Sequence, residues 1–427
     1  MTPTVATSVV SDLRSLFPSL SSVSPNGRPS IFLDNPGGTQ VPHAVIQAII
    51  DYLGSSNANT GGPFATSQRT DAMMMSARQA GADFLNASSP SEIMFGANMT
   101  TLAFSLSRAI GRTLQAGDEI VTTVLDHEAN IAPWSAMAQE RGAIHKRVDL
   151  RPSDCTLDME QLESMITSRT RLVAIGYASN ATGTINDVRH AIRLAHAVGA
   201  LVFVDAVQFA PHGLIDVQEL DCDFLACSAY KFFGPHVGLL FSKRTVLESL
   251  PVDKVRPQKD EAPYRFETGT LNHEGIAGTA AAIDYLASVG ALVSPQGRAM
   301  DRRSALEAAF SWIRAHEMGL FDRLLTGVEQ LTGVRVWGIT DRSNFSQRGP
   351  TLCFTWPAMT PAATAAWLGH EGVYVWDGDY YATTLMERLG LAPDGAIRLG
   401  LAHYNTDDEV DRVVQLLGDA ARGNGSG

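Results

Sequence analysis

The chain lacks several features that mark secreted, membrane-bound or nucleic-acid-binding proteins. Its 427 residues contain only four cysteines, Cys155, Cys222, Cys227 and Cys353, which is too few for a disulfide framework. Basic residues are not in excess, and a formal net charge of −12 argues against nucleic acid or an anionic membrane as a partner. No uninterrupted apolar run reaches about 18 residues, the length of a membrane span. The first residues also lack the basic and then apolar pattern of a signal peptide. We therefore expect a cytoplasmic protein.

Metal-ligand spacing is also missing. Cys222 and Cys227 have no cluster of histidines nearby, so we expect no metal site. What the chain does have is an ordinary globular composition, with 45% hydrophobic and 18% charged residues. Its length favours two or three domains.

Helical and strand patterns alternate between about residues 70 and 250. The predicted strands are 92–95, 119–123, 144–148, 172–177, 201–204, 224–227 and 238–241. Several are continuous apolar runs, such as Leu201–Val204, as expected where helices cover both faces of a sheet. This alternation predicts an α/β fold with a mostly parallel, doubly wound sheet.

Beyond about residue 290 the pattern changes. Helices are predicted at 301–315, 319–332, 360–371 and 407–420, and strands near 333–338 and 351–355. Helices on a short, partly antiparallel sheet form a smaller α+β domain. We predict an N-terminal arm over 1–30, a large domain over 31–290 and a small domain over 291–427, with the arm packed on the small domain.

Two side chains follow buried strands in the central part of the chain. Asp205 ends the run VFVD, at the carboxyl end of a parallel strand, where open α/β sheets bind ligands. Lys231 lies beyond the next apolar strand, next to Tyr230 and Phe232, and apolar surroundings lower the pKa of an amine and increase its nucleophilicity. Considered singly, Asp205 is better explained as a helix cap, and Lys231 is commonly explained as a surface lysine. The order of the two, an aspartate at one strand end followed by a lysine after the next strand, favours a functional site.

Together these motifs resemble the class V aminotransferase branch of the fold-type I pyridoxal-phosphate enzymes, on the side that contains the cysteine desulfurases. The resemblance covers about Ile31 to Leu417 and rests on the order of a Gly-rich N-terminal turn, DHEANIAPW, SNATGTIND, VDAVQ, SAYKFFGP, FETGTLN and IRLGLAHYN. It implies a large domain with a mostly parallel, seven-stranded sheet and a smaller C-terminal α+β domain.

The resemblance implies a role for each residue in its motifs. Lys231 would form a Schiff base with pyridoxal 5'-phosphate, and Asp205 would pair with the pyridine nitrogen. Gln208 would bond to the phenolic oxygen, and His127 would stack on the ring and move protons. Asn180 would support the ring oxygen or the substrate carboxylate.

The cofactor phosphate requires hydrogen-bond donors and a helix N-terminus. The resemblance assigns this task to the amides of Met99 and Thr100, the Thr100 hydroxyl, Ser228 and Tyr230. An ordinary helix cap is the alternative for Thr100. Thr270 would reach the phosphate of a neighbouring subunit, which implies a homodimer.

Arg398 would bind the substrate α-carboxylate, because a guanidinium donates two parallel hydrogen bonds to a carboxylate. It lies in an apolar, strand-like segment, where an unpaired charge is costly. The same motif therefore implies a small-molecule amino acid as substrate.

The chain departs from the desulfurase pattern at the loop that would carry the persulfide cysteine. That loop is Val375–Met386, Tyr381 stands at the nucleophile position, and none of the four cysteines lies on it. Tyr381 is a candidate proton donor, and an aromatic packing inward from a surface loop is the alternative. A second departure is Tyr230, where the desulfurases usually have histidine.

These features predict a pyridoxal-phosphate enzyme that forms a Schiff base with an amino acid. The first hypothesis is a C–S or other β- or γ-lyase that works without a persulfide cysteine. The second is an epimerase, an aminotransferase or a C–C bond-forming enzyme. The third is a non-catalytic ligand-binding relative, which the joint presence of Lys231, Asp205, His127 and Arg398 disfavours.

Overall fold

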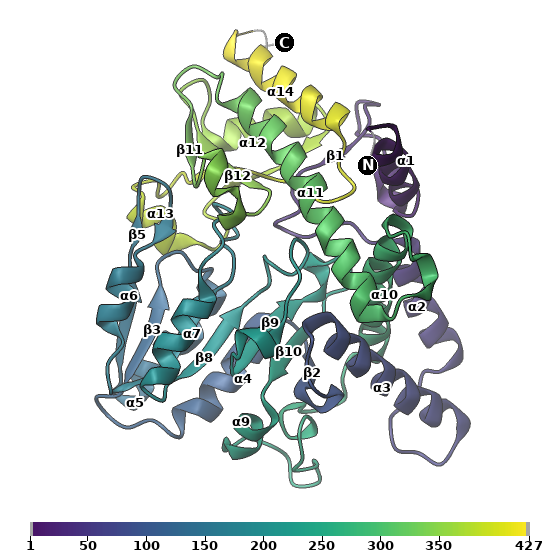
Figure 1. The fold of residues 1–427 in the computed structure, drawn as a ribbon, viewed down its shortest axis with the longest axis vertical. Helices are drawn as coiled ribbons and strands as arrows, with labels where there is room; N and C mark the ends of the chain where they lie inside the picture. The colour runs from purple at the N-terminus through teal and green to yellow at the C-terminus, as the bar shows by residue number, and fades with distance from the viewer. Residues whose placement is uncertain (1–2, 424–427) are drawn as a thin grey trace.

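A seven-stranded sheet forms the centre of the computed structural model, which describes residues 3–423 (Figure 1). The strands are β2 (Ile93–Gly96), β3 (Glu119–Thr123), β4 (Ile144–Val148), β7 (Thr170–Gly176), β8 (Leu201–Asp205), β9 (Phe224–Ser228) and β10 (Gly238–Ser242). Their order is β2-β10-β9-β8-β7-β3-β4, and only the pairings of β10 are antiparallel. The prediction of a mostly parallel α/β sheet is confirmed.

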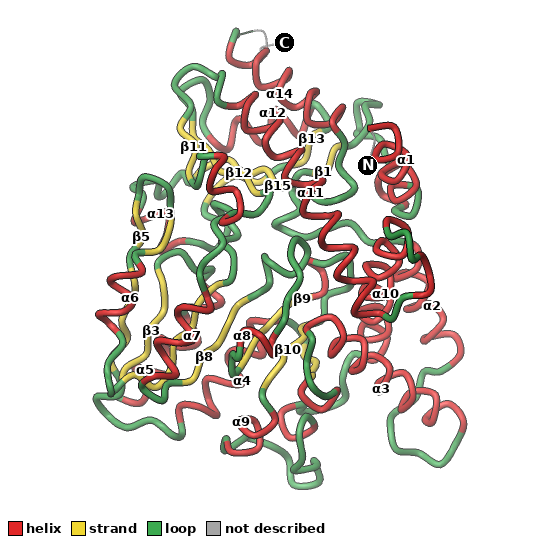
Figure 2. The backbone as a smooth tube through the Cα atoms, viewed as in Figure 1, coloured by secondary structure: helices red, strands yellow, loops and turns green. Residues whose placement is uncertain are grey.

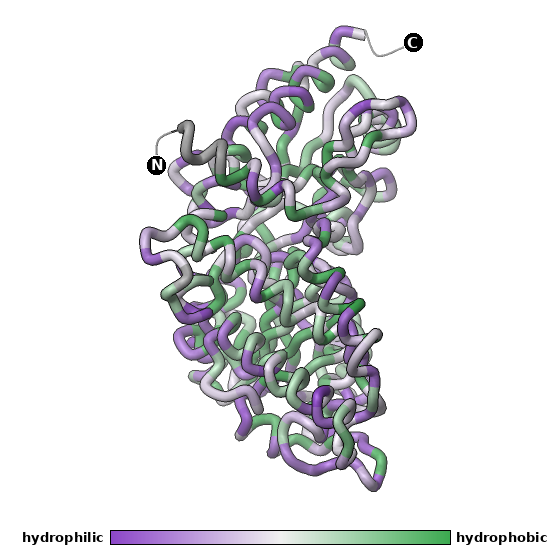
Figure 3. The backbone as a smooth tube through the Cα atoms, turned by 90° about the vertical axis from the view of Figure 1, so that its right-hand side faces the viewer, coloured by the Kyte–Doolittle hydropathy of each residue, from purple (hydrophilic) through white to green (hydrophobic). Residues whose placement is uncertain are grey.

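Both faces of this sheet are buried, as the continuous apolar strands predict. Along β8, Val202 and Val204 belong to one core cluster and Phe203 to another, because successive side chains point to opposite faces. Helices shown in red flank the yellow strands in Figure 2. The hydrophobic backbone segments concentrate in the interior in Figure 3.

A second, four-stranded sheet lies next to the first. It is antiparallel, in the order β11-β12-β15-β14, and consists of β11 (Arg335–Trp337), β12 (Thr351–Thr355), β14 (Trp376–Gly378) and β15 (Ala396–Gly400). Two short strand pairs complete the strands: β1 (Ile31–Phe32) pairs with β13 (Val373–Tyr374), and β5 (Leu150–Arg151) pairs with β6 (Thr156–Leu157). Arg14, near the N-terminus, forms an ion pair with Glu409 and donates a hydrogen bond to the Tyr404 carbonyl oxygen.

The helices connect and cover the two sheets. They are α1 (Pro3–Arg14), α2 (His43–Ser55), α3 (Ala65–Leu85), α4 (Met99–Gly111), α5 (Ala132–Arg141), α6 (Met159–Met165), α7 (Val188–Ala197), α8 (Val217–Leu220), α9 (Arg244–Ser249), α10 (His273–Val293), α11 (Arg302–Val328), α12 (Pro361–His370), α13 (Thr383–Arg388) and α14 (Asp407–Ala421). Short 3-10 turns include η3 (Glu128–Asn130) and η4 (Ala229–Lys231).

The prediction of two separate helices at 301–315 and 319–332 is wrong, because α11 runs unbroken through Gly319. Buried side chains on both sides of Gly319, such as Ile313 and Leu320, pack into the core along one helix. This packing outweighs the cost of one glycine in a helix, about 1 kcal/mol.

One helix, α10, is long and apolar enough to cross a membrane by length and composition alone. Half of its most apolar window is buried inside the protein, against α2, α3 and α11 among others. A helix in the core of a protein can have the same length and composition, so α10 is only weak evidence for a membrane span.

Candidate active site

The carboxyl ends of the parallel strands meet at one edge of the central sheet, and Lys231 lies there. It follows β9, is only 9% exposed, and donates a hydrogen bond from Nζ to the Pro36 carbonyl oxygen. Burial, followed by the charge of Arg398, lowers the pKa of Lys231 to about 7, although Asp205 and Asp34 act in the opposite direction. A large part of this amine is therefore neutral and nucleophilic near neutral pH.

Asp205 lines the same cavity, of about 550 Å³, as Lys231. It is the last residue of β8, and its Oδ1 accepts a hydrogen bond from the Val207 amide at 2.9 Å. Burial raises the pKa of Asp205 to about 6, and the Lys231 charge partly opposes that rise. Gln208 is buried in the same cavity with Nε2 3.4 Å from the Thr351 hydroxyl, and its Oε1 has no partner within residues 3–423.

His127 lies just before η3 and lines this cavity as well. Its Nδ1 accepts a hydrogen bond from the Ala129 amide at 2.9 Å, which leaves the proton of the neutral ring on Nε2. Burial, followed by the charges of Lys231 and Arg398, lowers the pKa of His127 to about 4. The imidazole is therefore neutral at physiological pH.

Donor groups gather where α4 begins. The Met99 amide donates to the Ser228 hydroxyl at 3.1 Å, and both residues line the cavity together with Thr100 and Tyr230. The Tyr230 ring stacks on His236 with centroids 5.0 Å apart, and burial raises the pKa of the Tyr230 phenol. A helix N-terminus and several hydroxyls therefore face one end of the space.

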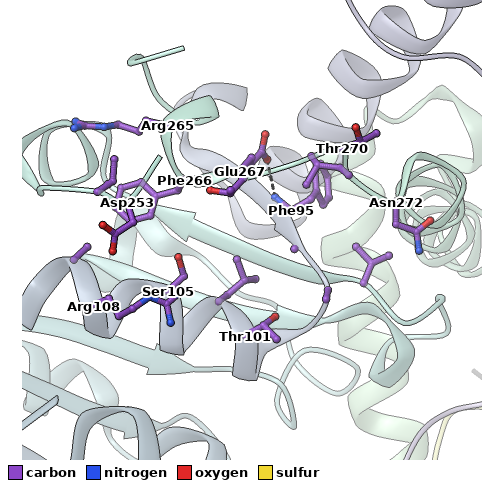
Figure 4. Close-up of a pocket in the computed structure, with 18 of the residues that line it drawn as sticks. Phe95, Thr101, Ser105, Arg108, Asp253, Arg265, Phe266, Glu267, Thr270 and Asn272 are labelled. Atoms are coloured by element: carbon purple, nitrogen blue, oxygen red, sulfur yellow. Dashed lines mark hydrogen bonds between the residues drawn. The ribbon is translucent and has the colours of Figure 1, made fainter. Parts of the chain in front are cut away.

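Thr270 lies elsewhere. It lines a different cavity of about 550 Å³, with Thr101, Ser105 and Asn272, shown in Figure 4, and not the cavity that Lys231 lines. The segment that contains Thr270 is fixed by Glu267, which accepts a hydrogen bond from the Phe95 amide and pairs with the buried Arg78. Within one chain the structure therefore does not bring Thr270 together with the other site residues.

Arg398 lines a further cavity, of about 670 Å³, that also contains Lys231 and His127. It is 4% exposed, and one of its nitrogens donates to the Asn180 carbonyl oxygen at 3.0 Å. The guanidinium carbon lies 4.3 Å from the centre of the Tyr380 ring, and Nε has no partner in the described part of the chain. Burial lowers the pKa of Arg398 to about 10, so the side chain is a buried cation that lacks a full set of acceptors.

The two cavities meet at Lys231. They share Thr100, His127, Ala129, Asn180, Tyr230 and Lys231. Asn180 donates from Nδ2 to the Tyr380 carbonyl oxygen at 2.9 Å, and its buried Oδ1 has no partner among residues 3–423. A ligand in the first cavity and another in the second would therefore contact each other next to the amine.

Tyr381 projects from the loop between β14 and α13 into the second cavity. The ring is 72% exposed and stacks on His127, with centroids 5.6 Å apart and planes 20° apart. All four cysteines are buried, and none lines either cavity. Burial raises the pKa of each thiol, so none of them has the thiolate character of a sulfur nucleophile.

Sequence reasoning missed Asp126, Glu128 and His236, which also line the site. Asp126 is buried and accepts hydrogen bonds from the Gly176 amide at 2.5 Å and the Thr123 hydroxyl at 2.9 Å. Burial and then the charge of Asp205 raise the pKa of Asp126 to about 7. Its position directly before His127 was the available signal, because residues that follow a strand end share that edge of the sheet.

The fold and this site define an α/β enzyme of the fold-type I class. The sequence model of the family described as Aminotransferase class-V matches residues 31–413, so the chain belongs to that family. Its members depend on pyridoxal phosphate. The chain is a cysteine desulfurase-like member.

Relatives and solved structures agree with this assignment. A cysteine desulfurase from Dickeya dadantii is 33% identical over 95% of each chain, and an aminotransferase-like protein from Gibberella zeae is 33% identical over 96% of this chain and 97% of its own. The structure of a cysteine desulfurase from Thermococcus onnurineus NA1, in its apo form, superposes with a TM-score of 0.83 at 26% identity, covering 97% of this chain and 98% of the other.

Proposed function

We propose that the chain binds pyridoxal phosphate on Lys231 and acts on an amino acid as a β- or γ-lyase, with C–S cleavage as the leading reaction and without a persulfide cysteine. The observation that carries the proposal is a buried, partly neutral amine between two cavities. Asn180, Gln208 and Arg398 line these cavities, and each has a buried polar atom without a partner within residues 3–423. Buried polar atoms without partners are costly, and a ligand would supply the partners.

The residues present fit this cofactor. Lys231 would hold the aldehyde carbon, Asp205 the ring nitrogen, and Gln208 the phenolic oxygen, while the start of α4 with Thr100 and Ser228 would bind the phosphate. When bound, the cofactor supplies an electron sink for the bonds at the substrate Cα. Its aldehyde end would then face the second cavity.

The substrate would bind in the second cavity. Arg398 would donate two hydrogen bonds to the α-carboxylate and so orient the amino acid toward Lys231. The Lys231 amine, once free, would remove the Cα proton, because it lines both cavities and its pKa is near 7. The Tyr381 phenol, which lines the same cavity, would give a proton to the leaving group, and neutral His127 would stack on the cofactor ring.

The proposed departure from desulfurase chemistry rests on the burial of all four thiols. A persulfide requires an accessible thiolate, and the buried thiols with raised pKa values do not provide one. The leaving sulfur would therefore depart with a proton, as sulfide or a thiol. The remaining carbon skeleton would leave as an imine, which water hydrolyses to a keto acid and ammonia.

An epimerase is the second candidate. Epimerisation at Cα needs two proton-carrying groups that reach the same carbon, and Lys231 and Tyr381 line the second cavity from different elements. This reaction predicts incorporation of solvent deuterium at Cα without net turnover.

A homodimer and a cytoplasmic location belong to the same proposal. Thr270 lines a cavity other than the one that contains Lys231, as expected of a residue that completes a neighbouring site. The helix α2 also exposes Ile46, Ile50 and Leu53 at helical spacing, an apolar stripe that suits contact with a second subunit.

The test is to add pyridoxal phosphate to purified protein and to measure its visible absorbance, then the products from amino acids. Wild-type protein is expected to turn yellow and to release pyruvate and ammonia, together with sulfide from cysteine or a thiol from S-substituted cysteines. Lys231→Ala should stay colourless, and Lys259→Ala, which removes an exposed lysine, should behave as wild type. Colourless wild-type protein would overturn the cofactor assignment, and deuterium exchange without products would favour the epimerase.

A further inference from the structure

The segment of residues 379–384, called the 379–384 loop below, comprises the connection after β14 and the first two residues of α13, and it adopts a backbone conformation that needs outside support. Tyr380 and Tyr381 are consecutive non-glycine residues with φ values of 55° and 57°. Left-handed conformations are unfavourable for residues with a Cβ, and they persist only where the surroundings hold them. Contacts with neighbouring residues must therefore hold Tyr380 and Tyr381 in this conformation.

Glu128 is the residue that ties this loop to the central sheet. Its Oε1 accepts hydrogen bonds from the Thr384 hydroxyl at 2.8 Å and from the Thr384 amide at 3.3 Å. The Glu128 amide in turn donates to the Tyr381 carbonyl oxygen at 2.8 Å. Glu128 thus contacts the 379–384 loop at two residues, through both its side chain and its backbone.

The Tyr380 hydroxyl donates to the Ala396 carbonyl oxygen, which ties the loop to β15 of the second sheet. The other polar contacts that could hold the loop to the central sheet are weaker. Asp379 accepts hydrogen bonds from the Tyr381 amide and the Thr383 hydroxyl, but both donors belong to the loop itself. Asn180 reaches the Tyr380 carbonyl oxygen through a single hydrogen bond. A carboxylate that accepts two hydrogen bonds forms a stronger link than a neutral amide that donates one.

These contacts determine where Tyr381 lies. Glu128 directly follows His127 in the chain, so the residue that holds the loop is covalently joined to the residue on which Tyr381 stacks. We propose that Glu128 is a positioning residue that locks the 379–384 loop over the substrate cavity and makes Tyr381 a fixed wall that restricts which amino-acid side chains enter. This proposal rests on the proposed function for its substrate, but the lock itself is a property of the chain alone.

The lock is tested first on the apo protein, by hydrogen exchange of peptides that cover residues 379–388. Glu128→Ala removes the acceptor, so exchange there should accelerate on the order of tenfold, as expected for the loss of hydrogen bonds to a charged group. Glu128→Gln keeps an oxygen acceptor and should exchange like wild type. Thr384→Val should accelerate exchange less than Glu128→Ala, and Thr384→Ser should leave it unchanged.

The second measurement is the substrate profile of the loaded enzyme. Glu128→Ala should raise KM for small amino acids more than it lowers kcat, and should accept bulkier side chains that wild type excludes. Glu128→Gln should restore the wild-type profile. Unchanged exchange in Glu128→Ala would overturn the lock, whether or not the protein binds a cofactor. Faster exchange with an unchanged profile would overturn the role of the lock in selectivity.

Discussion

Burial of the Lys231 amine sets a pH dependence that is measurable before any turnover. The folded pKa of about 7 lies below the usual 10.5, so the neutral amine is fully formed at a lower pH than for an exposed lysine. The rate at which apo protein combines with pyridoxal phosphate should rise up to about pH 7 and level off above about pH 8. Stopped-flow absorbance checks this, and a rate that keeps rising to pH 10 would contradict it.

Asp126 is expected to reduce the stability of the apo protein at neutral pH. Its folded pKa of about 7 is raised from 3.8, so the folded state binds this proton more tightly, and stability is lost as pH rises from about 4 through 7. Asp126→Asn removes this titration. The free energy of unfolding of wild type, relative to that of Asp126→Asn, should therefore fall by up to about 4 kcal/mol between pH 4 and pH 8.

Urea unfolding at both pH values measures this difference. The exposed Asp394→Asn serves as the control, since its carboxyl is not buried. A stability difference between Asp126→Asn and wild type that is the same at both pH values would refute the prediction.

At the scale of single elements, the start of α4 should depend on Ser228. The hydroxyl is buried and accepts from the Met99 amide, so Ser228→Ala leaves a buried N–H without a partner, at a cost of about 1–3 kcal/mol. Bound phosphate would give that amide a new acceptor but would itself lose the Ser228 hydroxyl as a donor, so the loss should persist when the cofactor is present. Thermal unfolding with and without pyridoxal phosphate tests this. Ser107→Ala is the control, since the Ser107 hydroxyl bonds only within α4.

The elements that sequence reasoning predicted well are those with a strong local pattern. The central strands are apolar runs bounded by turns, and β3 and β4 match the predicted ranges. The break expected near Gly319 was wrong because tertiary packing along α11 is not visible in local sequence. The hydrogen bond between Glu128 and Thr384 was missed for the same reason. Glu128 follows a strand of the central sheet and Thr384 lies between two strands of the second sheet, so the two residues are far apart in the sequence.

The position after a strand end brought Lys231 and Asp205 together, because parallel strands carry their ends to one edge. His127 and Asn180, which the family resemblance supplied, line the same cavity. Arg398 was located by its motif, and the structure places it near the same amine from the second sheet. The partner of Thr270 could not be derived from contacts within one chain, since a residue that completes a neighbouring site has no intramolecular signal.

At the scale of the whole molecule, the expected exchange of Thr270 between subunits has a decisive test. If each site takes Lys231 from one chain and Thr270 from the other, Lys231→Ala and Thr270→Val homodimers should both bind the cofactor poorly. Mixing and reassembling the two variants should then create heterodimers with one intact site each, about a quarter of all sites for random pairing. Cofactor absorbance and lyase activity should both recover toward that fraction. If Thr270 served its own chain, each heterodimer would hold one site without Lys231 and one without Thr270, and mixing would give no recovery beyond the average of the two variants.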